Sequence, residues 1–341
     1  MSAPAYERQA WLDVQEHKRK QAERSPRALL PGAAREKLED FAERIRSYLD
    51  SAPGYDKFSS AFGRALEGTF RVIGKLGARS VSSRRILTAY RKRKVDVTSL
   101  QQVRSLPLQE VDRVKPSLDV AYAGATMVSG TVLGFLAGGG TMVAVGTTVA
   151  SGGAAAAPSM GVVASILATD AAVTLAAVNR GLAHVAGYYG YDYRQREERL
   201  FALGVMNAAL AGTGKAAAYA ELNKIVQQLA RDASWKKLNE HALARISQRV
   251  FERFGYDLTK RKLGEVVPIV GAVIGGGLNA QLLNSALEEI DVLYRERFLR
   301  DRYGEAGPDG VGAYEVLPSS EGPSLTEIID AEVVEDDSLG E

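Results

Sequence analysis

The feature that most constrains this sequence is a run of 50 residues, Val120 to Thr169, without any Asp, Glu, Lys or Arg. The run is rich in small residues, including ten glycines. Residues 120–138 are numerous enough to span a bilayer, but only six of these nineteen are Val, Leu, Ile or Phe. These six contribute roughly −2 to −4 kcal/mol to insertion, which Gly, Ser and Thr partly offset. We therefore expect a segment that dips into a membrane, or moves between protein core and bilayer, and not a fixed span.

Glycine clusters indicate how the run is folded. The triplet at residues 138–140 predicts a turn, so residues 118–157 should form an uncharged helical hairpin rich in Gly and Ala. Glycines at four-residue spacing occur here and in a second uncharged run (266–287): Gly130, Gly134 and Gly138, then Gly271 and Gly275. Such spacing allows close helix contact in lipid. The alternative is a tightly packed soluble core, where each helical Gly costs about 1 kcal/mol relative to Ala.

The rest of the chain is patterned as helices, because apolar residues recur at three- and four-residue spacing and period-two alternation is absent. Helices are expected at 4–24, 33–49, 56–76, 117–137, 158–189, 192–211, 215–231, 234–254 and 268–303. The sequence predicts an all-α protein with one large domain over residues 1–303. This domain comprises basic helices (1–117), the uncharged segment (118–157) and a helical core (158–303). Residues 304–341, rich in Gly, Pro, Ser and acidic side chains, are expected to be a disordered acidic tail. Within it, residues 325–334 are apolar and prone to β-structure, and are either a short docking peptide or merely a sticky part of the tail.

The formal net charge of +2 hides a strong asymmetry. All 11 charged residues after Arg302 are acidic, so the first 303 residues carry 43 basic and 30 acidic side chains. A basic body predicts an anionic partner, such as a phospholipid surface or nucleic acid. The N-terminus lacks the layout of a secretory signal. We expect a cytoplasmic protein at the periphery of the cytoplasmic membrane.

The basic excess is densest over residues 79–94, which hold seven basic residues and no acidic one. These are Arg79, Arg84, Arg85, Arg91, Lys92, Arg93 and Lys94. One interpretation is a solvated helix face. The other is contact with lipid headgroups, to which each basic residue near an anionic membrane contributes about 1 kcal/mol. Nucleic acid ranks third, because no nucleic-acid-binding motif accompanies the charge.

Two passages, 189–192 and 254–257, share an aromatic residue followed by Gly, Tyr and Asp. In each, the glycine (Gly190, Gly255) suits the left-handed position after a helix end. The aspartate (Asp192, Asp257) suits the N-cap of the next helix. The alternative is an Asp-lined site. Helix caps are favoured, because every residue then has a local role.

Two polar residues stand inside otherwise apolar helical stretches. Asp170 ends the long uncharged run, and Asn279 lies within the second one. Because an unpaired buried carboxylate is costly, we expect Asp170 to be paired with an Arg or with hydroxyl groups. Asn279 is expected to form hydrogen bonds between helices.

The sequence does not support a catalytic or metal site. Cysteine is absent, and the three histidines are too scattered for a zinc site, so no metal or cofactor is expected. A Gly-Thr-Gly-Lys sequence ending at Lys215 lacks the first Gly and the final Ser or Thr of a phosphate-binding loop. Ser234 begins a Ser-x-x-Lys pattern whose companion motifs are missing.

Several short motifs occur in a characteristic order. They are Tyr6-Glu7 with Trp11, the glycine-rich run, Asp170, Tyr189 to Asp192, Glu197-Glu198-Arg199 with Phe201, Val267 to Ala272, Asn279, and Tyr294 to Leu299. Together they resemble the EcsC family over about residues 5–302. The family is named for a protein encoded beside the subunits of an ABC transporter. The resemblance implies a possible transporter subunit as partner and no catalytic residues, because none is established for the family.

Three hypotheses follow. The first is a non-enzymatic helical protein that binds an anionic membrane surface or lipid through residues 79–94 and the apolar hairpin. The second is a soluble accessory or interaction protein of a membrane transport system, with both glycine-rich runs in its own core. The third is a hydrolase or lipid-modifying enzyme built around Asp170, His184 or the two Gly-Tyr-Asp passages. The sequence does not determine the oligomeric state.

Overall fold

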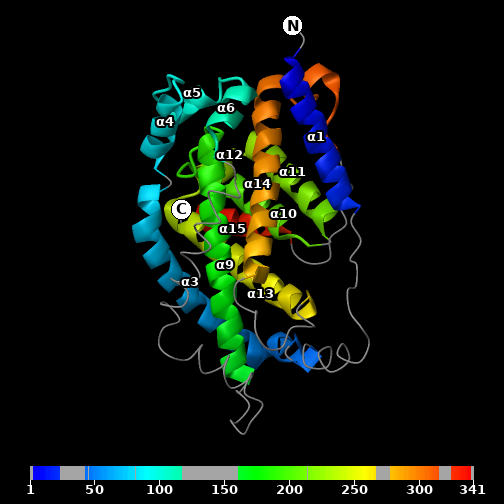
Figure 1. Ribbon diagram of the computed structural model, residues 1–341. Helices are drawn as coiled ribbons and strands as arrows, with labels where there is room; N and C mark the ends of the chain where they lie inside the picture. The colour runs from blue at the N-terminus through cyan, green and yellow to red at the C-terminus, as the bar shows by residue number, and fades with distance from the viewer. Residues whose placement is uncertain are drawn as a thin grey trace.

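The computed structural model describes residues 3–23, 43–44, 46–80, 82–116, 160–212, 214–265, 277–314 and 324–338. Every regular element within these residues is a helix, so the prediction of an all-α fold is confirmed (Figure 1). The predicted uncharged hairpin and the spaced glycines Gly130, Gly134, Gly138, Gly271 and Gly275 lie outside the described residues.

Two long helices, α9 (Met160–Tyr188) and α14 (Gly277–Tyr303), run through the middle of the molecule (Figure 1). Helix α3 (Ala52–Ser80) packs against α9, as does α13 (Glu240–Glu265), while α10 (Arg196–Leu210) packs against α14. The sequence of α9 is predominantly apolar, and most of its Ala, Leu and Val side chains that the structure describes are buried. The core of the fold therefore surrounds α9.

The first helix, α1 (Ala5–Ala22), packs along α14. Its buried residues are Glu7, Ala10, Trp11, Val14 and Lys18. The Glu7 carboxylate accepts a hydrogen bond from the N–H of Leu108 at 2.9 Å, and another from the Arg302 guanidinium at 2.7 Å. The Tyr303 hydroxyl also donates to it. Glu7 therefore ties α1 to the start of α6 and to the end of α14.

Shorter helices complete the fold. They are α4 (Ser83–Lys92), α5 (Leu100–Val103), α6 (Leu108–Val114), α11 (Lys215–Arg231) and α12 (Ala233–Lys237). The starts of α4, α5 and α12 follow local signals, because the side chains of Ser82, Ser99 and Asp232 accept backbone N–H groups of the first turn. Helix α3 starts earlier than expected and includes Pro53, since proline is tolerated in a first turn.

Helix α9 ends in a Schellman motif centred on Gly190, which has a φ of 87°. The N–H of Tyr191 donates to the carbonyl of Ala186 at 2.9 Å, and that of Gly190 to the carbonyl of Gly187 at 3.0 Å. A Cβ at Gly190 would lie 2.5 Å from the carbonyl oxygen of Leu100. Glycine is therefore required both by the backbone conformation and by the close approach of α5.

The predicted N-cap role of Asp192 is wrong. Helix α10 begins at Arg196, and its N-cap is Gln195. The Asp192 carboxylate instead accepts the backbone N–H of Arg194 at 3.1 Å and pairs with the Arg194 guanidinium at 2.8 Å. This local turn satisfies the aspartate before the helix begins.

The predicted caps at Gly255 and Asp257 are also wrong, because α13 continues through both residues to Glu265. A Cβ on Gly255 would lie 2.4 Å from Cε2 of Phe62 in α3. Glycine here permits the close approach of two helices. The Asp257 carboxylate lies 3.8 Å from the guanidinium of Arg253, one turn earlier in the same helix.

The prediction of disorder over residues 304–341 is wrong for the part that forms α15 (Leu325–Ser338). A short 3-10 helix, η1 (Pro308–Gly310), precedes it. Leu325 and Ile329 are fully buried and lie one turn apart on the same face. The apolar spacing, which lets this segment pack as a helix, outweighs the acidic composition that predicted disorder.

Candidate functional site

A polar cavity of about 910 Å³ lies between α1, α6 and α14. It is lined by Tyr6 of α1, by Asp112, Lys115 and Pro116 in and after α6, and by Gln281, Asn284, Ser285, Glu288, Asp291 and Arg295 of α14. The α14 residues recur at three- and four-residue spacing, which places them on one face of the helix. The cavity therefore has a polar wall supplied by a single helix.

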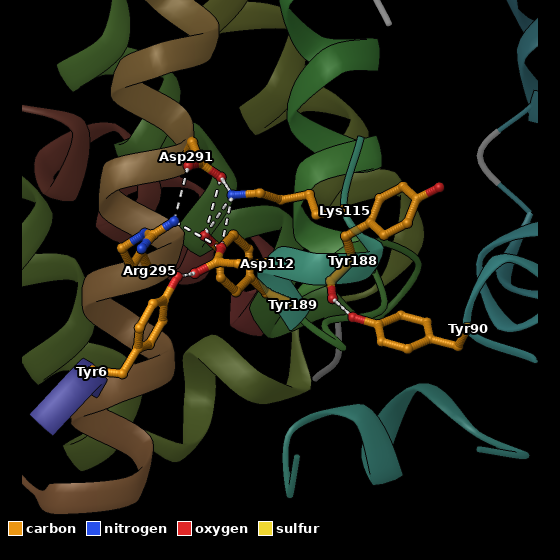
Figure 2. Close-up of polar contacts among 8 residues, drawn as sticks. All are labelled: Tyr6, Tyr90, Asp112, Lys115, Tyr188, Tyr189, Asp291 and Arg295. Atoms are coloured by element: carbon orange, nitrogen blue, oxygen red, sulfur yellow. Dashed lines mark hydrogen bonds and ion pairs between the residues drawn. The ribbon is translucent and has the colours of Figure 1, made fainter. Parts of the chain in front are cut away.

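Asp112 connects α1 and α14 across this cavity (Figure 2). Its Oδ2 accepts the hydroxyl proton of Tyr6 at 2.8 Å, and its Oδ1 accepts a guanidinium N–H of Arg295 at 2.7 Å. Arg295 also lies 3.9 Å from the Asp291 carboxylate. One carboxylate thus fixes the positions of three helices.

Lys115 forms the other half of the network (Figure 2). Its ammonium group donates to the Tyr189 hydroxyl at 2.9 Å and to the Asp291 carboxylate, and it lies 3.6 Å from Asp112. The Tyr189 hydroxyl donates to Asp291 at 3.1 Å. Two cations and two carboxylates balance each other here, so the network needs no external counterion.

The pKa values of Tyr6, Tyr189 and Arg295 are all raised in the network. Burial raises the pKa of Tyr189 well above its usual value, and Asp291 raises it further. Burial and the hydrogen bond to Asp112 raise the pKa of Tyr6. Burial opposes the charge of Arg295, but Tyr189, Asp112 and Asp291 together raise its pKa. None of these three can act as a general base near pH 7.

Basic side chains on α4 and on the two residues that follow it form a second surface feature. Arg84, Arg85, Arg91, Lys92, Arg93 and Lys94 are all exposed, whereas Ile86 and Tyr90 are buried. We call the six exposed residues the α4 basic face. The Tyr90 hydroxyl donates to the carbonyl of Tyr188 at 2.6 Å, next to Tyr189, which bonds to Lys115 and Asp291 (Figure 2).

The α4 basic face has no acidic partner in the part of the chain that the structure describes. The side chain of Arg91 donates only to Thr88 at 3.3 Å. Among the described residues, no helix combines the length and the apolar character needed to cross a bilayer. Arg79, the first of the predicted basic residues, belongs to α3.

The residues named for the enzyme hypothesis do not converge. Asp170 and His184 are both on α9, 14 residues apart, which corresponds to about 21 Å along a helix. Asp170 is half-buried, and its carbonyl accepts the Thr174 hydroxyl at 2.9 Å. Burial lowers the pKa of His184. Within the described residues, no three His, Cys, Asp or Glu are arranged to hold a metal.

The structure also shows where Asn279 and Lys215, two further residues singled out in the sequence, are located. Asn279 lies near the start of α14. Lys215, at the end of the loop-like Gly-Thr-Gly-Lys sequence, is buried and donates to the carbonyl of Ala208 at 2.6 Å. Because its ammonium group points at the last carbonyls of α10, it is not presented to a phosphate.

The cavity residues Asp112, Lys115, Asp291 and Arg295 are not among the site residues predicted from the sequence. Two local signals were present, because Asp112 and Lys115 are three residues apart and Asp291 and Arg295 are four apart, on amphipathic helices. A third signal was the set of short motifs in characteristic order. Tyr6, Tyr189 and Arg295 belong to three of them, and all three residues meet in this network.

The fold and the cavity define a helical protein whose polar interior is organised by ion pairs between distant helices. The chain belongs to the EcsC protein family, whose model matches residues 9–299. It is similar to the uncharacterised protein YdbA of Bacillus subtilis (strain 168), with 23% identity over 248 residues, covering 71% of this chain and 79% of YdbA. No solved structure matches this chain significantly.

Proposed function

We propose that this EcsC-family protein associates with membranes and binds their anionic surface through the α4 basic face. The observation that carries this proposal is the exposure of Arg84, Arg85, Arg91, Lys92, Arg93 and Lys94 without an acidic partner among the described residues. Each such cation near an anionic membrane contributes about 1 kcal/mol. The face therefore supplies enough attraction for reversible peripheral binding.

The close packing of α4 against the end of α9 supports the proposal. Ile86 lies so close to α9 that a Cβ on Gly187 would be 2.3 Å from its Cδ1. Tyr90 adds the hydrogen bond to the carbonyl of Tyr188. With its apolar side held this closely, α4 presents its cations as one surface. In this proposal the uncharged residues 120–157, outside the described residues, add apolar anchorage.

The test is flotation of the full chain with vesicles of phosphatidylglycerol and phosphatidylcholine, compared with pure phosphatidylcholine. We expect binding to the anionic vesicles that weakens as salt is added. The double variant Lys92→Gln/Arg93→Gln removes two of the exposed charges and should weaken binding about 30-fold, from about 1 kcal/mol for each charge.

The matched control is Lys224→Gln/Arg231→Gln, which removes two exposed charges from α11. Its vesicle binding should stay close to that of the wild type. Equal loss in both variants would show that only net charge matters. Failure of the wild type to float at low salt would reject the proposal and leave the accessory-protein hypothesis.

A further inference from the structure

Helix α15 docks on α11, α12 and α13 through a defined set of contacts. Fully buried Leu325 and Ile329, with Val333 at 9% exposure, form its apolar side. The Trp235 indole N–H donates to Asp330 at 2.8 Å, and Glu221 accepts the backbone N–H of Leu325. These contacts join α15 to residues that are about 90 to 100 positions earlier in the chain.

The strongest of these contacts centres on Glu332, whose side chain is completely buried. Its carboxylate lies 2.7 Å from the Arg245 guanidinium and 2.5 Å from that of Arg249, one turn later on α13. The two arginines are themselves 35% and 50% exposed. They are therefore surface groups that α15 covers, and not part of a core that needs them.

The position of α15 in the chain sets it apart from the rest of the fold. It lies beyond residues 9–299, the part matched by the family model. A segment of nine residues, 315–323, connects it to the body and includes two prolines, a glycine and two serines. Helix α15 contains six acidic residues and no basic one. An acidic helix that follows a segment rich in Pro, Gly and Ser is typical of a recognition helix on a linker.

We propose that the surface formed by Glu221, Trp235, Arg245 and Arg249 is a helix-binding site, and that residues 325–338 are its exchangeable intramolecular ligand. The partner that this α15 docking surface fits is an acidic amphipathic helix. Such a helix has large apolar residues at its first and fifth positions and a carboxylate at its eighth, as Leu325, Ile329 and Glu332 have. A partner helix with this pattern displaces α15 and takes its place.

The test uses a fluorescent peptide of residues 324–338 and the full chain carrying Ile329→Asp/Glu332→Arg, which cannot seat its own α15. The peptide should bind this variant at least about 100-fold more tightly than the wild type, whose tethered helix competes at high effective concentration. Added salt should weaken binding, because the Glu332 pair is half-exposed on the arginine side.

The control adds Arg245→Gln/Arg249→Gln to the same variant and should greatly weaken peptide binding, since Glu332 of the peptide then has no cation to pair with. A variant that keeps its helical circular dichroism but does not bind the peptide would overturn the proposal. Loss of the folded state in the variant would also overturn it, because α15 would then be an integral part of the fold.

A second experiment leaves the native residues of α15 unchanged. A protease site placed within 315–323 of the full chain is cleaved, and excess labelled peptide is added. Replacement of the cleaved helix by the peptide on size-exclusion chromatography supports the proposal. A cleaved helix that stays bound without exchange contradicts it.

Discussion

Glu289 shows how single residues organise the interior of this fold. Its carboxylate accepts the Tyr219 hydroxyl at 2.6 Å and lies 3.1 Å from the Lys215 ammonium and 3.3 Å from His17 Nε2. These partners come from α11 and α1, while Glu289 is on α14. Burial opposes its ionisation, but His17, Lys215 and Tyr219 together lower the pKa of Glu289 below 4.5.

The first prediction concerns Glu289→Gln. Breaking a buried ion pair by removing one partner leaves Lys215 without its counterion and should cost about 3 kcal/mol at pH 7. Because the folded state lowers the pKa of Glu289, its contribution is complete above pH 4.5 and is lost as pH falls through the lowered pKa. Urea unfolding of both proteins from neutral to acidic pH should show the difference between the two stabilities shrinking as the pH falls below 4.5.

Glu240→Gln is the matched control for this prediction. Glu240 accepts from Arg199 on the surface and is exposed. The same chemical change there should leave the free energy of unfolding close to that of the wild type. A stability difference between wild type and Glu289→Gln that does not change with pH would contradict the role assigned to Glu289.

At the scale of elements, the two aromatic-Gly-Tyr-Asp passages show what sequence can and cannot predict. The end of α9 depends on hydrogen bonds within five residues of Gly190 and on its φ of 87°. Those determinants are local. The same pattern at Gly255 lies within a continuous helix, because Phe62 packs against it and Asp50 accepts the Tyr256 hydroxyl. Those partners are about 200 residues away, so no local pattern could reveal them.

This difference leads to a prediction for two helical glycines. Gly63→Ala in α3 should stabilise the protein by about 0.5–1 kcal/mol, because nothing lies within 4 Å of the new Cβ and the helix gains propensity. Gly255→Ala gains the same propensity but places its Cβ 2.4 Å from Phe62, so it should destabilise the protein by about 1–3 kcal/mol. Thermal and urea unfolding measure both. Equal effects of the two substitutions would show that Gly255 is not a packing position.

At the scale of the whole molecule, the helical class and most element positions follow from apolar periodicity. The cavity does not, because Tyr6, Asp112 and Arg295 are separated by 106 and 183 residues and meet only through helix packing. The prediction of disorder for the C-terminal tail was wrong for a related reason. Its composition predicted disorder, but Leu325, Ile329 and Glu332 find partners on helices formed about 100 residues earlier.

Hydrogen–deuterium exchange should distinguish the core helices from the docked helix α15. The slowest amides should belong to the described parts of α9, α10 and α14, which contribute nearly half of the buried apolar residues. Amides of α15 should exchange faster than those of α9, because their protection depends on docking and not on global unfolding. Exchange of α15 as slow as that of α9 would contradict its separate character.

The bond between Glu7 and Arg302 has a consequence for biosynthesis. The two residues are 295 positions apart, so a ribosome adding about 5–20 residues per second needs about 15–60 s to produce the second after the first. Throughout that interval Glu7 lacks its ion-pair partner. Lys18 likewise lacks its partner, Glu296, until α14 is synthesised. Helix α1 therefore cannot take its final place until Glu296 and Arg302 of α14 have been synthesised.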